Sequence, residues 1–205
     1  LTGIVPPRLG NLSTLILLDL SSCTLTGTIP TSLGQLYNLQ YLMLFSNQEL
    51  TGAILVVLGN LSKLIVLELN SCTLTGSIPA SLGQLSHLQM LVLFDNAQIV
   101  GSIPIEFCNL SSLTELYLSD CTLTGTIPAN LGSLVFLELL WLDHNFLSGS
   151  IPTTFSNCSK LQQIGLQNNM LSGNLNGIFN SDIQRSLILV DVSDNQLTGP
   201  LPTTY

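Results

Sequence analysis

Carboxylates and a histidine recur at one place in the pattern of this 205-residue chain. Asp95, Asp120, Asp143 and His144 stand at the carboxyl ends of consecutive predicted strands, so they would meet along one edge of a sheet. Neighbouring carboxylates can bind Ca²⁺, which takes about six to eight oxygen ligands. No pattern in the sequence makes that many oxygens converge, and surface aspartates are ordinarily solvated. We therefore predict no metal site and no cofactor.

Signatures of catalysis are not found in the sequence. It contains no nucleophile elbow, no phosphate-binding glycine loop and no spaced set of metal ligands, so we expect a protein that is not an enzyme. The chain has 4 Lys and Arg residues against 12 Asp and Glu residues, a net charge of −8. Such a surface repels phosphate backbones, which excludes nucleic acid as a partner. No apolar run is long enough to predict a membrane span.

The five cysteines suggest redox chemistry, but their spacing argues against disulfides. Cys23, Cys72 and Cys121 occupy one repeat position, two repeats apart. Stacked strands lie about 4.8 Å apart, so these residues would be roughly 10 Å from one another. A disulfide requires Cα atoms within about 7 Å. We expect five free and mostly buried thiols, with Cys108 and Cys158 included.

The same cysteines mark an internal repeat. Cys-Thr-Leu-Thr-Gly recurs at a spacing of 49 residues from Cys23 onward, and a looser copy stands midway in each interval. The looser copies begin at Asn47, Asn96 and Asn145. A tandem array of this kind forms one elongated domain whose units contact only their neighbours. We therefore predict a single domain over residues 1–205.

Eight segments of the form L-x-x-L-x-L-x-x-(Cys or Asn) predict the strands of this array. Their closing residues are 24–26 residues apart, a spacing typical of units built from one strand and one short helical segment. Alternation places Leu18 and Leu20 inside and Asp19 outside. Gly27 suits a backbone that turns tightly or approaches a neighbour closely, the Ile-Pro that follows ends the strand ladder, and Ser32 to Leu36 predict a short amphipathic turn. The expected architecture is a parallel sheet on the concave side and helical or 3₁₀ turns on the convex side.

The full pattern, L-x-x-L-x-L-x-x-N-x-L-(T/S)-G-x-I-P-x-x-L-G-x-L, covers essentially the whole chain and resembles the plant-type leucine-rich repeat. Such repeats form the ectodomains of receptor-like kinases and polygalacturonase-inhibiting proteins. The resemblance implies a curved α/β repeat solenoid of about eight repeats, located outside the cell or at its surface. It also implies a non-catalytic scaffold, a segment of a receptor or of a secreted inhibitor, that binds a protein, a peptide or a cell-wall glycan.

The sequence departs from that family in its ends, which lack the cysteine-containing caps that flank such arrays. An uncapped array would expose leucines at both ends. We expect either a segment of a longer protein or ends that partners cover. The alternative function is therefore a structural subunit of a larger assembly.

Outward positions on the predicted strands carry the side chains that regular packing leaves unexplained. Many are apolar or aromatic, and a contiguous exposed patch of this kind usually marks a binding site. Self-packing across strands, or a covering segment, is the other explanation. We expect Trp141 to matter most. The predicted partner-binding residues are Tyr41, Met43, Phe45, Met90, Val92, Phe94, Tyr117, Trp141, Asp143 and His144.

Four Asn-x-Ser sequons recur at one position, predicted as the start of the convex segment. They are acceptors for N-glycosylation if the protein enters a secretory pathway, and otherwise they suit a turn. The candidate asparagines are Asn11, Asn60, Asn109 and Asn157.

A ladder of hydroxyl residues precedes the repeated glycines. A regular hydroxyl array can match an ice lattice, although Thr or Ser is also the ordinary residue at this place and Val100 interrupts the run. Ice binding is therefore the weaker alternative function. The ladder consists of Thr26, Thr51, Thr75, Thr124, Ser148, Ser172 and Thr198.

Overall fold

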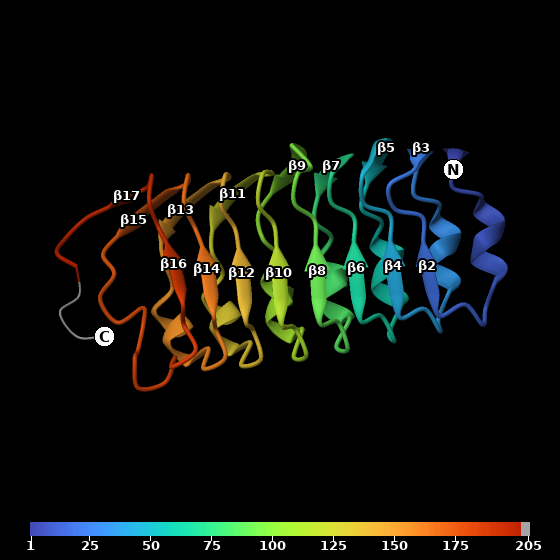
Figure 1. The fold of residues 1–205 in the computed structure, drawn as a ribbon. Coiled ribbons are helices and arrows are strands. Elements are labelled where there is room, and N and C mark those ends of the chain that lie inside the picture. Colours follow the sequence, from blue (N-terminus) through green and yellow to red (C-terminus); the bar gives the residue numbers. More distant parts are fainter. Residues whose placement is uncertain (202–205) are drawn as a thin grey trace.

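A computed structural model describes residues 1–201, so the last four residues of the predicted domain lie outside the described part. Eight parallel strands form the sheet predicted for the concave side, here called the front sheet (Figure 1). Each strand is centred on an apolar residue of the alternating segment, which is buried in every strand but the last, where Val190 is 41% exposed. The strands are β2 (Leu17–Asp19), β4 (Tyr41–Met43), β6 (Val66–Glu68), β8 (Met90–Val92), β10 (Glu115–Tyr117), β12 (Leu139–Trp141), β14 (Gln163–Gly165) and β16 (Leu189–Asp191).

A second parallel sheet of nine strands, here called the side sheet, runs along another side of the array. It is built from the Leu-Thr-Gly stretches, which were predicted to be turns, and that prediction is wrong. The strands are β1 (Thr2–Ile4), β3 (Thr24–Thr28), β5 (Asn47–Ala53), β7 (Cys72–Ser77), β9 (Gln98–Gly101), β11 (Thr122–Thr126), β13 (Phe146–Ser150), β15 (Met170–Gly173) and β17 (Gln196–Leu197).

The glycines of the side sheet explain how a turn-like sequence forms a strand. Gly52 has φ +83°, a conformation that favours glycine. A Cβ atom at Gly52 would also lie 2.8 Å from Cγ2 of Thr28 in the preceding repeat. The glycine therefore permits both the backbone conformation and the close approach of neighbouring strands. An Ile-Pro pair follows the strand in most repeats, as predicted, but β5 ends at Ala53 before Ile54-Leu55, without a proline.

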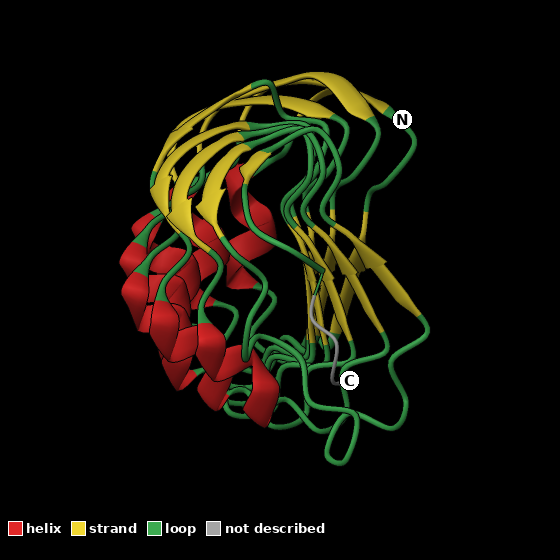
Figure 2. Ribbon diagram, turned by 90° about the vertical axis from the view of Figure 1, so that its left-hand side faces the viewer, coloured by secondary structure: helices red, strands yellow, loops and turns green. Residues whose placement is uncertain are grey.

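Short 3₁₀ helices form the third side of the array (Figure 2), which confirms the predicted helical turns. Six of them begin directly after a proline in extended conformation, because its fixed φ suits the residue that precedes a helix. In residues 1–201, no helix has the length and apolar character needed to span a bilayer. The helices are η1 (Pro7–Asn11), η2 (Thr31–Gln35), η3 (Val56–Asn60), η4 (Ala80–Gln84), η5 (Ile105–Asn109), η6 (Ala129–Ser133) and η7 (Thr153–Asn157).

The core between the three sides is a continuous stack of leucine and isoleucine, with Phe107 and Phe155 fully buried. Each layer is covered by the next one, so burial depends on the neighbouring repeats. All five cysteines are free; three are buried and two are half-buried, as predicted. Burial raises the pKa of the Cys121 and Cys158 thiols to about 11, so these two remain protonated and inert at neutral pH.

A buried asparagine ties each Asn-type repeat to the repeat before it. The Asn96 side chain accepts a hydrogen bond from the Leu74 N–H at 3.1 Å and donates to the carbonyls of Leu69 at 3.0 Å and Leu93 at 2.9 Å. One amide thus satisfies backbone groups in two repeats that would otherwise be buried without partners. The same arrangement recurs at Asn47, Asn145, Asn169 and Asn195.

Cys72 and Cys121 replace this asparagine in repeats that follow a repeat with an extra residue, those of Asn47 and Asn96. The Cys121 thiol donates to the Leu93 carbonyl at 3.6 Å but offers the backbone no strong acceptor. In the repeat before it, the Ile99 N–H instead donates to the Asn96 carbonyl at 2.9 Å. The added residue therefore closes its turn locally, which explains why units alternate with a period of two repeats.

We predict that Asn96→Ala lowers the free energy of unfolding by at least about 2 kcal/mol, because it leaves buried N–H and C=O groups without partners. Urea denaturation followed by circular dichroism measures the loss. Asn60→Ala is the matched control, since Asn60 is exposed at the end of η3, and it should change stability by less than about 0.5 kcal/mol. Equal losses in the two variants would contradict the ladder's structural role.

Candidate recognition surface

Outward side chains of the front sheet form rows that cross the strands. The backbone register aligns one row from β2 to β16 and a second row two residues earlier on each strand. The first of these two rows contains Asp19, Met43, Glu68, Val92, Tyr117, Trp141, Gly165 and Asp191. The earlier row contains Leu17, Tyr41, Val66, Met90, Glu115, Leu139, Gln163 and Leu189.

Most of the predicted partner-binding residues lie on this face. Partly exposed side chains are those of Tyr41, Met43, Phe45, Met90, Phe94, Tyr117 and Trp141, and His144 is exposed. The expectation of exposure is wrong for Val92 and Asp143, whose exposed fractions are 6% and 7%. The small Val92 side chain stands between the longer Glu68 and Tyr117 in its row, and Asp143 is drawn against Ser119.

Trp141 lies against Gly165 of the next strand. A Cβ atom at Gly165 would be 2.7 Å from Cζ3 of the indole and 3.2 Å from Oε1 of Gln167. The missing side chain therefore provides the space in which the ring rests on the sheet. Oε1 of Gln167 is buried without a hydrogen-bond partner among the described residues. The sequence analysis did not predict this contact between Trp141 and Gly165. The signal for it is the glycine itself, because the other positions of the same row hold longer side chains.

The charged groups among the strand residues of the front sheet are all carboxylates. Burial, followed by repulsion from Asp19 and Glu115, raises the pKa of Glu68. Burial also raises the pKa of Tyr117 to about 12, and its hydroxyl donates to Glu115 at 2.9 Å. The Ser21 hydroxyl, which donates to Asp19 at 2.6 Å, lowers the pKa of that carboxyl. The front sheet thus combines apolar side chains with carboxyl groups, and no cationic residue lies on its described strands.

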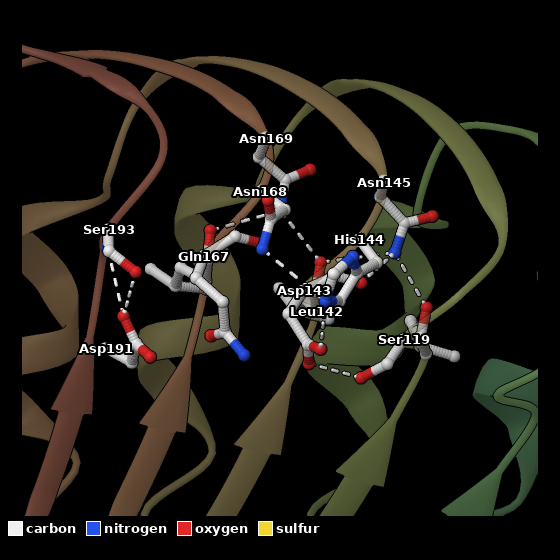
Figure 3. A network of polar contacts seen from close by, with 12 residues as sticks. Ser119, Leu142, Asp143, His144, Asn145, Gln167, Asn168, Asn169, Asp191 and Ser193 are labelled. Carbon is white, nitrogen blue, oxygen red and sulfur yellow. Dashed lines mark hydrogen bonds and ion pairs between the residues drawn. The ribbon is translucent and has the colours of Figure 1, made fainter.

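Polar residues gather where the front strands end (Figure 3). Ser119 donates to the Asp143 carboxylate at 2.5 Å, while His144 Nε2 lies 3.9 Å from Asp143 and 3.4 Å from the Asn168 amide. Serine, aspartate and histidine are the components of a hydrolytic triad, but nucleophilic catalysis requires the serine to contact the histidine. Here the serine is bonded to the carboxylate instead, so the three side chains do not form a Ser-His-Asp triad.

The row of acidic residues considered for Ca²⁺ has a conformational origin. Asp95, Asp120 and His144 have φ between 51° and 56°, the left-handed region in which Asp, Asn and His are enriched. Every repeat has one residue in this left-handed conformation, directly before its Cys or Asn, and the first three of these residues are serines. Over residues 1–201, no group of three or more His, Cys, Asp or Glu side chains is placed to share a metal ion.

The sequon asparagines Asn11, Asn60, Asn109 and Asn157 are all exposed. Each is the last residue of its 3₁₀ helix (η1, η3, η5 and η7), so the prediction that they open the convex segment is wrong. They lie on the helical side of the array. Sugars attached there would leave the front sheet accessible.

The hydroxyl ladder lies on the side sheet. Several of its members donate to the backbone of the preceding repeat, as Thr124 does to Gly101 at 3.4 Å and Ser148 to Gly125 at 3.3 Å. Glu49 is the one charged residue within the described strands of this sheet. The side sheet is therefore almost uncharged, in contrast to the front sheet.

Comparison with known proteins identifies the repeat. The Leucine Rich Repeat family model matches residues 14–36, 63–85, 112–134 and 136–158. No curated protein matches the chain at a significant level. Among solved structures, the chain is similar to the leucine-rich-repeat ectodomain of the membrane receptor kinase GASSHO1/SCHENGEN3 from Arabidopsis thaliana, in complex with CASPARIAN STRIP INTEGRITY FACTOR 2. That match has 33% identity and a TM-score of 0.92, and it covers 98% of this chain and 24% of the other.

Two further structures are informative. The Arabidopsis receptor kinase HAESA, in complex with the peptide hormone IDA and the co-receptor SERK1, matches with 33% identity and a TM-score of 0.88 over 98% of this chain and 37% of that one. A plant ice-binding protein matches with 29% identity and a TM-score of 0.71 over 89% of this chain and 64% of that one. The chain thus spans only about a quarter to two fifths of the two receptor structures.

We predict that Gly165→Ala displaces the Trp141 ring and lowers stability by about 1–3 kcal/mol, the usual cost of overpacking. Trp141 is the only tryptophan, so intrinsic fluorescence reports its position alone, and the emission should shift to longer wavelength as the ring leaves the sheet. Gln163→Ala, on the same strand, is the control and should leave the emission unchanged. An unaltered spectrum for Gly165→Ala would contradict the contact described between Trp141 and Gly165.

Proposed function

We propose that this chain, a leucine-rich-repeat solenoid, is a non-catalytic recognition scaffold that holds a peptide on its front sheet. The observation that carries the proposal is the band of partly exposed aromatic and apolar side chains from β4 to β12, which lies on a rigid sheet. Two structural relatives were solved with CASPARIAN STRIP INTEGRITY FACTOR 2 and with the peptide hormone IDA, which supports the same class of ligand here.

The dimensions and composition of the band suit peptide recognition. Strands β4 to β12 number five, and at about 4.8 Å between neighbours the band extends roughly 20 Å along the array. Tyrosine, tryptophan and methionine are enriched at the centres of protein interfaces. Trp141 is held in place by Gly165, so little conformational entropy is lost when a ligand covers it.

We further propose an extracellular or cell-surface location, as a segment of a receptor or a secreted inhibitor. Glycans at Asn11, Asn60, Asn109 and Asn157 would cover the helical side and leave the front sheet free. A cell-wall glycan is the other ligand class that the sequence predicts. A structural role in a larger assembly predicts instead that the isolated protein associates with itself, which light scattering measures.

Selection from a phage-displayed library of random linear peptides tests the proposal. We expect the enriched peptides to bind the front sheet, so that Trp141→Ala and Phe94→Ala each weaken binding about 30-fold, the effect of truncating a hot-spot side chain worth about 2 kcal/mol. Fluorescence anisotropy with the selected peptides measures the affinities.

Phe136→Ala is the control for that experiment. Phe136 is an exposed aromatic residue, but it lies in the turn between η6 and β12, outside the front sheet. Its substitution should leave binding within about twofold of the original protein. Peptides that bind the Trp141 and Phe94 variants as tightly as the original protein would exclude the front sheet as the site.

Ice binding by the side sheet is a second candidate, favoured by the nearly uncharged threonine rows and by the similarity to a plant ice-binding protein. This candidate predicts that micromolar protein inhibits ice recrystallisation. Thr75→Tyr should abolish the effect because a large side chain would lift the ice surface from the row, whereas Phe94→Ala on the front sheet should retain it. Absence of inhibition by the original protein would exclude this candidate.

A further inference from the structure

From β2 to β12, acidic and apolar strands alternate across the front sheet, whereas β14 has no charged residue and β16 carries Asp191. Asp19, Glu68 and Glu115 lie on β2, β6 and β10, the strands of the Cys-type repeats. Asp19 and Glu68 stand in one row, whereas Glu115 stands two residues earlier on its strand, in the row of Met90. The strands between and beyond them, β4, β8 and β12, present only uncharged side chains, among them Met43 and Trp141. This striped pattern is the outward consequence of the period of two repeats, and nothing in the packing of the core requires it.

The stripes have a definite spacing. Neighbouring strands are about 4.8 Å apart, so successive acidic strands are about 10 Å apart. A peptide in the polyproline II conformation has three residues per turn and rises about 3.1 Å per residue, so every third side chain points the same way at intervals of about 9.3 Å. In a β-strand, side chains on the same face are about 6.7 Å apart, which does not match the spacing of the acidic strands.

The charge of the face calls for a cationic ligand. The chain's own cations lie elsewhere: Arg8 is in η1, Lys63 and Lys160 are in turns that follow η3 and η7, and Arg185 precedes β16. Glu68 is partly desolvated and is repelled by Asp19 and Glu115, which disfavours its ionised form. A cation placed at Glu68 would relieve that repulsion and gain a charge-assisted hydrogen bond.

We infer that the ligand of the front sheet is a polyproline II peptide with a lysine or arginine at every third position. It crosses the strands along the array, so that two successive basic side chains reach Asp19 and Glu68, and the next extends along β10, past Tyr117, to Glu115. The residues between them cover apolar side chains such as Met43 and Trp141. This inference rests on the proposed function and specifies the chemistry of its ligand.

Two synthetic peptides of identical composition test the inference. One repeats Lys-Pro-Leu three times, and the other contains the same residues with its three lysines adjacent. We expect the first to bind about tenfold more tightly by isothermal titration calorimetry. Glu68→Gln should weaken the first peptide about tenfold, whereas Glu106→Gln, a matched change on η5 at the helical side, should leave it unaffected. Glu68→Gln removes a repelled carboxylate, so its thermal midpoint should be no lower than that of the original protein.

Equal affinities of the two peptides, or a first peptide insensitive to Glu68→Gln, would overturn the inference. The phage selection keeps this failure separate from failure of the proposed function. Selected peptides that depend on Trp141 but lack basic residues at a spacing of three would leave the front sheet as the binding site and reject the basic polyproline II ligand. Selected peptides that ignore Trp141 would reject the surface itself.

Discussion

The structure depends on how backbone groups are satisfied where the front strands end. At that point each repeat must turn inside the core, and a turn there leaves N–H and C=O groups away from water. A single buried amide, such as that of Asn96, supplies an acceptor to one repeat and donors to two. These hydrogen bonds fix how one repeat sits on the next. They therefore set the spacing of the leucine stack, of both sheets and of the row of helices.

Uniform stacking separates the inside of the array from its surface. Inward positions are occupied by leucine and isoleucine in repeat after repeat, whereas outward positions on the front sheet vary in size and charge. The rigid backbone holds those varied side chains in register, as the row from Asp19 to Asp191 shows. The front sheet therefore presents side chains that vary from strand to strand, whereas the side sheet presents nearly the same side chains in each repeat.

Periodicity allowed much of the fold to be predicted, because the alternation of Leu18, Asp19 and Leu20 reports which side of a strand is buried. The side sheet could not be predicted in this way, because glycine and proline weaken strands in general. The sequence left a tight turn and a close approach open for Gly52, and the neighbouring repeat shows the close approach. The burial of Val92 and Asp143 likewise depends on residues of adjacent strands. The sequence of a single strand does not report the size of the side chains on the adjacent strands.

The extra residue that accompanies each later cysteine has a consequence for how such an array can grow. Removing or adding one repeat here would separate a cysteine repeat from the repeat with the extra residue. The cysteine repeat would then lack the neighbouring hydrogen bond from the Ile99 N–H to the Asn96 carbonyl, or the repeat with the extra residue would be followed by no cysteine. In this alternating part, length can change at low cost only by pairs, whereas ordinary asparagine repeats follow one another singly from Asn145 onward. Every added pair would bring one more acidic strand and one more apolar strand to the front sheet. The reach of this surface would therefore increase in fixed steps, each equal to one turn of the ligand inferred for it.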